Sequence, residues 1–212
     1  MAAHKAAGPV VAADEEMSYQ EFLSRYDGIH AEWVQGKVQL MAPIGDRHDE
    51  LSQFMNHLFS TFVALHGLGR VKMAPSQTRL GPDLPGREPD LMYIAPQRLE
   101  FIKPNYVDGP PDLVIEIVSP ESRVRDYGEK MDEYEQAGVR EYWIIDPPRE
   151  DALFYQLGDD GIFRRITPDA AGRYLCRVLP GLVLEPVWLW RDPLPTILEV
   201  ADLVRVMEAP GE

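Results

Sequence analysis

The sequence is poor in cysteine. Cys176 is the single cysteine among 212 residues, which excludes an internal disulfide and a multi-cysteine zinc site. It lies in an alternating, strand-like segment, and we interpret it as a small packed side chain rather than a nucleophile. One thiol is also compatible with a reducing cytoplasm.

Long hydrophobic runs are missing too. No stretch approaches the roughly 20 apolar residues of a membrane-spanning helix. The apolar stretch at the N-terminus is broken by Gly8-Pro9 and runs into Asp14-Glu15-Glu16, a pattern that does not fit a signal peptide. We therefore expect a soluble, cytoplasmic protein with no membrane partner.

Basic charge and nucleotide-binding motifs are scarce or absent. The chain has 21 Lys and Arg against 35 Asp and Glu, a net charge of −14. This balance argues against a general nucleic-acid coat protein, which carries a basic face. It leaves room for an enzyme that holds nucleic acid through a few local contacts and metal ions. No Walker loop, G-x-G-x-x-G or G-x-S-x-G motif occurs, so a nucleotide cofactor and a serine nucleophile elbow have no support.

The length and composition fit one globular domain. Hydrophobic residues make up 45% of the chain and charged residues 26%, as in an ordinary water-soluble protein. We expect residues 1–16 to be a disordered leader, because they are small and broken by glycine and proline. Residues 17–208 then form a single domain, and 209–212 a short tail.

The hydrophobic pattern predicts an α/β fold with a mixed sheet. The best helix is predicted over 46–66, where apolar residues recur at helical spacing. A strand over 112–119, a helix over 122–137 and a strand over 139–146 make a βαβ unit, so the two strands should be parallel neighbours. Other elements are predicted as follows: a short helix from Ser18, a hairpin over 31–41, strands near 69–74, 76–80 and 89–95, an antiparallel meander of 152–157, 162–167 and 173–179, and a helix over 195–207.

Glu116 interrupts a strand that is otherwise apolar. Residues 112–119 read Asp-Leu-Val-Ile-Glu-Ile-Val-Ser, and both faces of this strand are aliphatic, which is typical of a strand covered on both sides. An ionised carboxylate there costs several kcal/mol unless it is paired or bound to a cation. Asp90 opens another apolar strand, and if the two strands adjoin, both carboxylates converge at one end of the sheet. Two hard oxygen ligands of this kind suit Mg²⁺ or Mn²⁺.

Lys130 lies within the apolar stripe of the following helix. Tyr127, Lys130, Met131 and Tyr134 stand at i, i+3, i+4 and i+7, which is one face of a helix. The lysine therefore points toward the sheet, and its long stem could reach the carboxylates. In a phosphoryl-transfer site such a cation orients water or stabilises charge on the phosphate.

Simpler interpretations stand beside these. Glu116 and Lys130 could form a structural ion pair without metal, and Asp126 has the i,i+4 spacing of an ordinary helical salt bridge to Lys130. Asp90 could cap a loop. Glu32 is a weaker candidate for a further carboxylate, with a solvated strand end as its alternative.

His48, near the start of the long helix, is the other weaker candidate. It could shuttle protons or touch substrate, although histidines of this kind are often surface residues. The remaining histidines show no metal-ligand grouping, and they are His4, His30, His57 and His66.

Several blocks of the chain resemble the Uma-two family of endonucleases. Three of them are Pro89-Asp90, Pro111-Asp112-Leu-Val-Ile-Glu116-Ile-Val-Ser119-Pro120 and Asp126-Tyr-Gly-Glu-Lys130. Two more are Tyr134-Glu-Gln-Ala-Gly138-Val-Arg-Glu-Tyr-Trp143-Ile-Ile-Asp146-Pro147 and Glu32-Trp-Val-Gln-Gly36-Lys-Val-Gln-Leu-Met-Ala-Pro43, with His48 after it. The resemblance covers about residues 17–160. This family belongs to the PD-(D/E)XK superfamily, which implies a restriction-endonuclease-like fold: a mixed β-sheet core flanked by helices, here with additional C-terminal antiparallel strands.

The resemblance implies a role for each residue of the motif. Asp90 and Glu116 match its two acidic positions and would bind the metal, with the backbone carbonyl of Ile117 as a further ligand. Val118 stands where the superfamily pattern has a lysine, and the family supplies that lysine from the following helix, which is Lys130 here. The resemblance also implies a homodimer.

We therefore expect a Mg²⁺- or Mn²⁺-dependent endonuclease that acts on DNA or a related nucleic acid. Two alternatives remain open. One is a non-catalytic dimeric scaffold that keeps the nuclease fold, with Asp90, Glu116 and Lys130 as a buried ion network. The other is a metal-free acid/base hydrolase built on Asp90 and Glu116, which no sugar-binding aromatic cluster supports.

Overall fold

The computed structural model describes residues 10–12, 16–41 and 45–207. Its strands form two six-stranded sheets and one two-stranded sheet. The N-terminal sheet has the order β1-β3-β2-β6-β5-β8 and the central sheet the order β12-β11-β10-β9-β7-β4. The N-terminal sheet consists of β1 (Val10–Ala12), β2 (Ala31–Val34), β3 (Lys37–Leu40), β5 (Gln77–Arg79), β6 (Gly86–Arg87) and β8 (Tyr106–Asp108). The central sheet consists of β4 (Arg70–Met73), β7 (Leu91–Ile94), β9 (Leu113–Ile117), β10 (Glu141–Asp146), β11 (Asp151–Leu157) and β12 (Phe163–Ile166).

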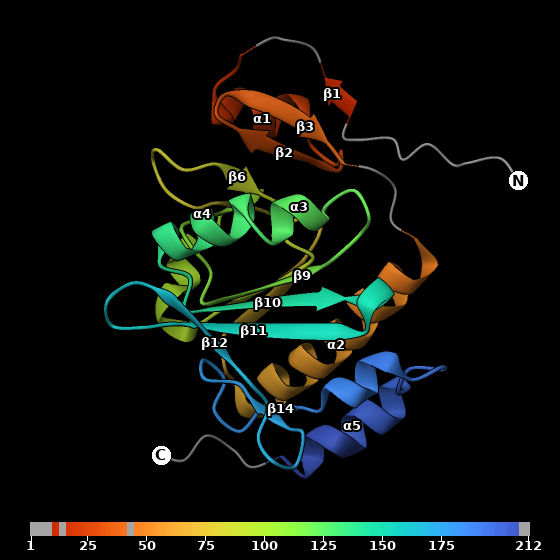
Figure 1. Ribbon diagram of the computed structural model, residues 1–212. Coiled ribbons are helices and arrows are strands. Elements are labelled where there is room, and N and C mark those ends of the chain that lie inside the picture. Colours follow the sequence, from red (N-terminus) through yellow and green to blue (C-terminus); the bar gives the residue numbers. More distant parts are fainter. Residues whose placement is uncertain (1–9, 13–15, 42–44, 208–212) are drawn as a thin grey trace, which may run out of the picture.

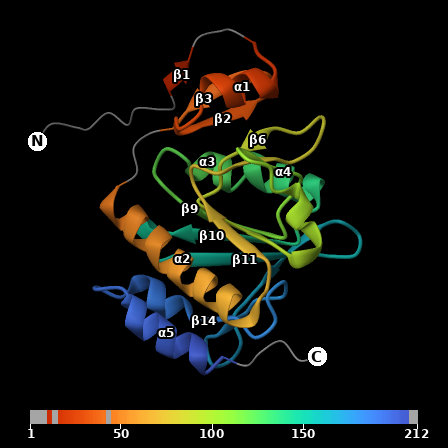
Figure 2. The same ribbon diagram turned by 180° about the vertical axis from the view of Figure 1, so that it is seen from behind.

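The helices cover both faces of the central sheet (Figures 1 and 2). The α-helices are α1 (Tyr19–Arg25), α2 (Asp46–His66), α3 (Arg123–Asp126), α4 (Glu129–Ala137) and α5 (Ile197–Arg205), and the 3₁₀ segments are η1 (Pro96–Phe101), η2 (Pro147–Arg149) and η3 (Pro186–Trp190). Helix α2 lies on one face with α5 packed behind it, while α3 and α4 lie between the other face and β2–β3. The two strands β13 (Tyr174–Leu175) and β14 (Val183–Leu184) form the small third sheet.

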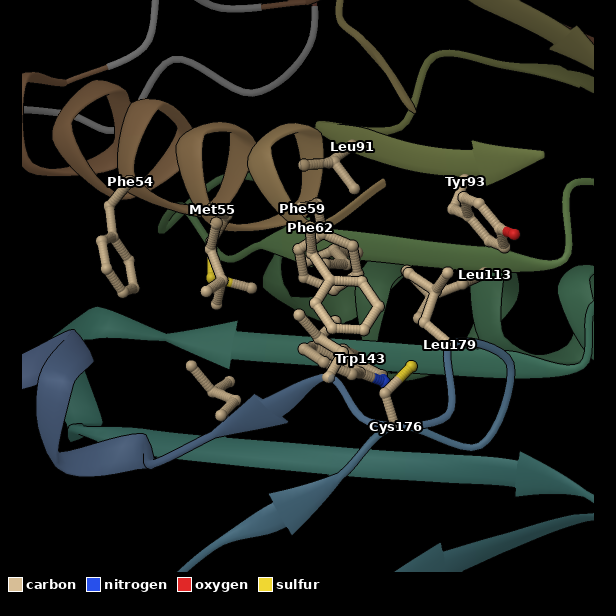
Figure 3. Close-up of a cluster of buried hydrophobic side chains, with 14 of the residues drawn as sticks. Phe54, Met55, Phe59, Phe62, Leu91, Tyr93, Leu113, Trp143, Cys176 and Leu179 are labelled. Carbon is tan, nitrogen blue, oxygen red and sulfur yellow. The ribbon is translucent and has the colours of Figure 1, made fainter. Parts of the chain in front are cut away.

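Helix α2 supplies much of the main hydrophobic core. Its apolar residues recur at helical spacing and are buried, and Gly67 ends the helix with a left-handed backbone, φ 66°. Phe54, Met55 and Phe59 point from α2 toward β7, β9 and β10, where the ring of Trp143 meets that of Phe59 edge-on (Figure 3). This packing fixes the helix, and with it His48 in the helix's first turn, against the sheet.

Strand β9 is covered on both faces, as the sequence predicts. Leu113, Ile115 and Ile117 belong to the core on the α2 side, while Val114 and Val118 pack with Tyr134 of α4 on the other side. The neighbours of β9 are β10, in parallel register, and β7, in antiparallel register. The βαβ unit is therefore confirmed, and the condition for Asp90 and Glu116 to converge is met, because β7, which follows Asp90, adjoins β9.

Four expectations need correction. The leader over 1–16 contains a strand, because β1 pairs with β3. Residues 1–9 and 13–15 of the leader and the tail over 209–212 lie outside the described residues. The helix over 122–137 is two helices, because the backbone departs from helical geometry at Gly128, with φ −131° and ψ −93°. The third strand of the meander pairs with β14 rather than β12. The final helix buries Val200 and Val204, while Ile197 and Leu198, which open its predicted apolar stripe, are exposed.

No helix in the described ranges is long and apolar enough to cross a membrane.

Candidate active site

Lys130 stands at the centre of a group of buried carboxylates. Its Nζ lies 3.0 Å from Glu116 Oε2, 3.2 Å from Asp126 Oδ1 and 3.4 Å from Glu32 Oε1. We call Lys130 and these three acids the lysine cluster. All four side chains are at most 4% exposed, so their mutual attractions are screened far less than those of surface pairs.

Each member of the lysine cluster comes from a different element. Glu116 projects from β9 on the side that faces α4, and Lys130 lies in the first turn of α4. Asp126 ends α3, and Glu32 belongs to β2 of the N-terminal sheet. The cluster therefore joins both sheets through α4, which lies between them (Figure 1).

A second buried cation neutralises Glu32 from the far side. The side chain of Arg87, on β6, is fully buried, and its Nη1 lies 2.8 Å from Glu32 Oε2. The same guanidinium binds two acids of α4, with Nη2 2.5 Å from Glu129 Oε1 and Nε 2.7 Å from Glu133 Oε2. Gly86 makes this placement possible, since a Cβ there would collide with the ring of Tyr19.

The pKa values of the two glutamates move in opposite directions. Burial alone would raise the pKa of Glu32, but Lys130 and Arg87 lower it to about 2. Burial raises the pKa of Glu116 to about 8, because Lys130 only partly opposes desolvation and the repulsion from Asp126. Burial would lower the pKa of Lys130, yet the carboxylates around it raise that pKa well above its ordinary value. Lys130 is therefore a permanent cation, and the site holds more acid than it can neutralise.

Tyr134 fixes the other oxygen of Glu116. Its hydroxyl donates a hydrogen bond of 2.7 Å to Glu116 Oε1, and both groups are buried. The tyrosine lies one turn after Lys130 on the same face of α4. One helix face therefore holds both oxygens of the strand carboxylate.

Asp90 and His48 form a second pair beside the lysine cluster. His48 Nε2 lies 3.2 Å from Asp90 Oδ2, which also accepts a 2.6 Å hydrogen bond from the backbone N–H of Ile117. Burial alone would lower the pKa of His48, but its hydrogen bonds to Asp90 and to the backbone carbonyl of Ile117 raise it. The histidine thus contacts two of the three groups expected to bind a metal.

Asp90, Glu116, Ile117 and Lys130 line one small cavity of about 50 Å³. A water molecule needs roughly 10–15 Å³ of such space, so an ion with a few waters fits. In the described part of the chain, no three His, Cys, Asp or Glu side chains are grouped to hold a metal by themselves. Mg²⁺ does not require three, because it is commonly held by one or two carboxylates and keeps several waters. The two carboxylates, the carbonyl and the excess of acid fit a divalent cation.

The structure brings together all the residues that the sequence singles out. Glu32 is fully buried rather than a solvated strand end, and the side chain of His48 is only 11% exposed rather than a surface residue. The ordinary salt bridge from Asp126 to Lys130 also forms, but it is buried and shares Lys130 with Glu116. Lys130 therefore reaches the strand carboxylate and also makes the helical salt bridge.

Sequence reasoning missed two members of the site. Arg87 lies in a polar stretch, Gly-Arg-Glu-Pro-Asp, that gives no sign of burial. Tyr134 stood on the predicted helix face, and its position one turn from Lys130 could have identified it as a partner of Glu116.

Comparisons with known proteins agree with this architecture. The sequence profile of the Uma2 family, described as "putative restriction endonuclease", matches residues 18–186. The crystal structure of a "putative nuclease belonging to DUF820" from Anabaena variabilis superposes with a TM-score of 0.61 at 15% identity, covering 89% of this chain and 99% of the other, which establishes a shared fold. None of the curated protein sequences compared with the chain gives a significant match. Because the family profile spans most of the sequence, the chain belongs to the Uma2 family.

Proposed function

We propose that this protein is a metal-dependent endonuclease that hydrolyses phosphodiester bonds of DNA. The observation that carries the proposal is the single cavity in which Asp90, Glu116 and Lys130 meet, with Lys130 Nζ 3.0 Å from Glu116 Oε2. A buried acid with a strongly shifted pKa beside a charge partner is typical of functional sites. Family membership supports the same reaction class.

Asp90, Glu116 and the carbonyl of Ile117 would hold Mg²⁺ or Mn²⁺. Such an ion, when bound, supplies a Lewis acid and lowers the pKa of coordinated water. Tyr134 orients the Glu116 carboxylate through its hydrogen bond to Oε1. Lys130, which stays protonated, acts as a hydrogen-bond donor and positive charge toward the attacking water or the phosphate, and not as a base.

His48 is the group placed to move a proton. Its ring is bound to Asp90, and Ser52 Oγ lies 3.4 Å from the other ring nitrogen, Nδ1. When the ring is protonated, it can donate a proton to a leaving oxygen. In the metal-free protein, Asp90 and the Ile117 carbonyl raise the pKa of His48 and so favour that protonated form.

The test is cleavage of single-stranded and duplex DNA with Mg²⁺ or Mn²⁺, with and without EDTA. Glu116→Gln and Lys130→Met should each lose about 100-fold or more in rate, comparable to removing one transition-state donor. Glu100→Gln and Lys103→Met are matched controls, because neither residue lines the cavity: Glu100 is exposed, and Lys103 is partly exposed and donates its Nζ hydrogen bond to the Glu100 carbonyl. Metal-dependent cleavage that survives in both site variants would contradict the assignment, and cleavage that survives EDTA would favour the metal-free hydrolase.

A non-catalytic scaffold is the second candidate, and one observation favours it. Lys130 and Arg87 already pair with the buried carboxylates without any further cation, so the network could serve stability alone. This alternative predicts no saturable metal binding and no cleavage by the folded protein.

We also propose a homodimer, with contacts through the strands after residue 150. Leu175 of β13 is 57% exposed on that part of the surface. Sedimentation equilibrium of wild type and Leu175→Glu tests this directly: a dimer that Leu175→Glu dissociates is expected, and a monomeric wild type would contradict it.

A further inference from the structure

A second, larger hollow adjoins the cavity of the candidate active site. It measures about 380 Å³, within the range of small-molecule sites, and shares His48 and Ser119 with that cavity. Its lining is mainly apolar and includes Val118, directly after β9, and Pro120, Pro147, Pro148 and Trp190. Arg47 and Glu150 add one charged side chain of each sign. The resemblance to the Uma2 family gives no role to Trp190 or the prolines of this hollow.

Arg47 holds Trp190 at the hollow. Its Nη2 donates hydrogen bonds of 2.9 Å to the carbonyls of Leu189 and Arg191, which flank Trp190 on both sides. Arg47 immediately precedes His48 on α2, so the tryptophan segment is tied to the helix turn that carries the active-site histidine. The aromatic ring is therefore part of a built wall next to the site.

Cations near the site are already engaged by protein groups. Arg123 Nη2 lies 2.9 Å from Asp146 Oδ1, Arg125 Nη1 lies 3.4 Å from Gln39 Oε1, and Lys130 is surrounded by carboxylates. With a net charge of −14, the protein has little free basic charge with which to follow the two phosphate backbones of a duplex. Stacking on an aromatic ring contributes about 1–3 kcal/mol per base and does not itself require a basic side chain.

Another hollow that His48 lines lacks an aromatic wall. It measures about 480 Å³ and is lined by Asp49 and Asp90, with Met73 and Pro75 as apolar contributors and no Trp, Tyr or Phe. The Trp190 hollow has one carboxylate, Glu150, against these two, and it offers the π face on which an unpaired base stacks. The Trp190 hollow is the better base site of the two.

We infer that the Trp190 hollow binds an unpaired nucleobase next to the scissile phosphate, so that the preferred substrate is single-stranded or locally unpaired DNA. This inference rests on the proposed function and specifies its substrate class. Binding then depends on base stacking more than on phosphate contacts.

The experiment is anisotropy of a short fluorescent single-stranded DNA, and of the same sequence as a duplex, measured in EDTA so that binding is separated from cleavage. Trp190→Leu keeps an apolar side chain but removes the π face, and Trp190→Phe restores a ring. Trp188→Leu is the matched control, because Trp188 packs on the same core but lines a different hollow. We expect Trp190→Leu to weaken single-strand binding about 10-fold, within the range measured for one stacked base. Trp190→Phe and Trp188→Leu should bind like the wild type.

Two results would overturn the inference: equal single-strand binding by wild type and folded Trp190→Leu, or equal weakening by Trp188→Leu and Trp190→Leu. The cleavage assay separates this inference from the proposed function. Trp190-dependent binding without cleavage would support the base site and count against the nuclease. Cleavage of duplex DNA that is indifferent to Trp190 would support the nuclease and contradict the base site.

Discussion

Lys130 Nζ lies 3.0 Å from Glu116 Oε2 across the boundary between α4 and the central sheet. Both side chains are almost completely buried, and each has a further partner: Asp126 for the lysine and Tyr134 for the glutamate. The pair therefore joins a helix and a strand whose relative position sets the geometry of the whole cavity. Removing either charge should affect both stability and metal binding.

Lys130→Met should destabilise the fold strongly. It leaves three buried carboxylates without their shared cation, and breaking a buried ion pair costs about 3–5 kcal/mol. Urea unfolding in EDTA measures this loss, with Lys103→Met, outside the lysine cluster, as control. Addition of Mn²⁺ should recover part of the lost stability, because a bound cation replaces the missing charge. A variant as stable as wild type in EDTA would contradict the electrostatic role.

The free energy of unfolding should fall as pH rises from about 5 to 8 in the absence of metal. Glu116 has a pKa of about 8 when folded, against an ordinary value of 4.5, so between these values the folded protein binds more protons than the unfolded chain. Stability then decreases with pH, by at most about 1.4 kcal/mol per unit from this one group. Glu116→Gln should flatten the decrease. Urea midpoints measured across this range check it, and an unchanged slope in the variant would assign the effect to another group.

The contribution of Glu32 to the free energy of unfolding changes with pH in the opposite direction, and at low pH. Its pKa is lowered to about 2 from 4.5, so its stabilising contribution is present above pH 4.5 and is lost as pH falls toward 2. Glu32→Gln should therefore be less stable than wild type at pH 6 and approach it in acid. The measurement is urea unfolding of both proteins at matched pH, with Glu100→Gln as control. A stability gap that does not close in acid would contradict the ionised state of Glu32.

The sequence predicts the site better than it predicts the periphery. Glu116 and Lys130 stand out because each breaks an apolar pattern whose geometry is local, a strand face or a helix face. The parallel β9–β10 pair follows from the strand–helix–strand order, whereas the adjacency of β7 and β9 is supplied by the structure. Burial of Glu32 could not be predicted in this way, because it depends on β2 meeting α4 from a separate sheet.

Arg87 and the C-terminal strands illustrate the same limit. Arg87 is buried only because Glu32, Glu129 and Glu133 converge on it from two other elements. The strand at 173–179 has the alternation of a meander strand, yet β13 pairs with β14. Pairing between strands is a tertiary choice that alternation alone does not encode.

Arg87→Lys should show how far the guanidinium fork matters. Lysine keeps the charge but cannot contact Glu32, Glu129 and Glu133 together, so we expect a loss of about 1.5–3 kcal/mol, the value of a charged hydrogen bond. Thermal and urea unfolding measure it, and Arg205→Lys, on an exposed side chain, is the matched control.

Arg87→Met combined with Glu32→Gln should be less destabilised than the sum of the single changes, because the two residues are in contact. Strict additivity would contradict a direct coupling.

Calorimetric titration of Mn²⁺ into the wild type and Glu116→Gln is the measurement to make first, since it requires no knowledge of the substrate. We predict saturable binding by the wild type. Below pH 8, binding should release a proton, because Glu116 has a pKa of about 8 and must ionise to bind the metal. Glu116→Gln should bind at least about 10-fold more weakly. Equal binding by both folded proteins, or no binding by the wild type even with a DNA strand present, would contradict a metal site built on Glu116.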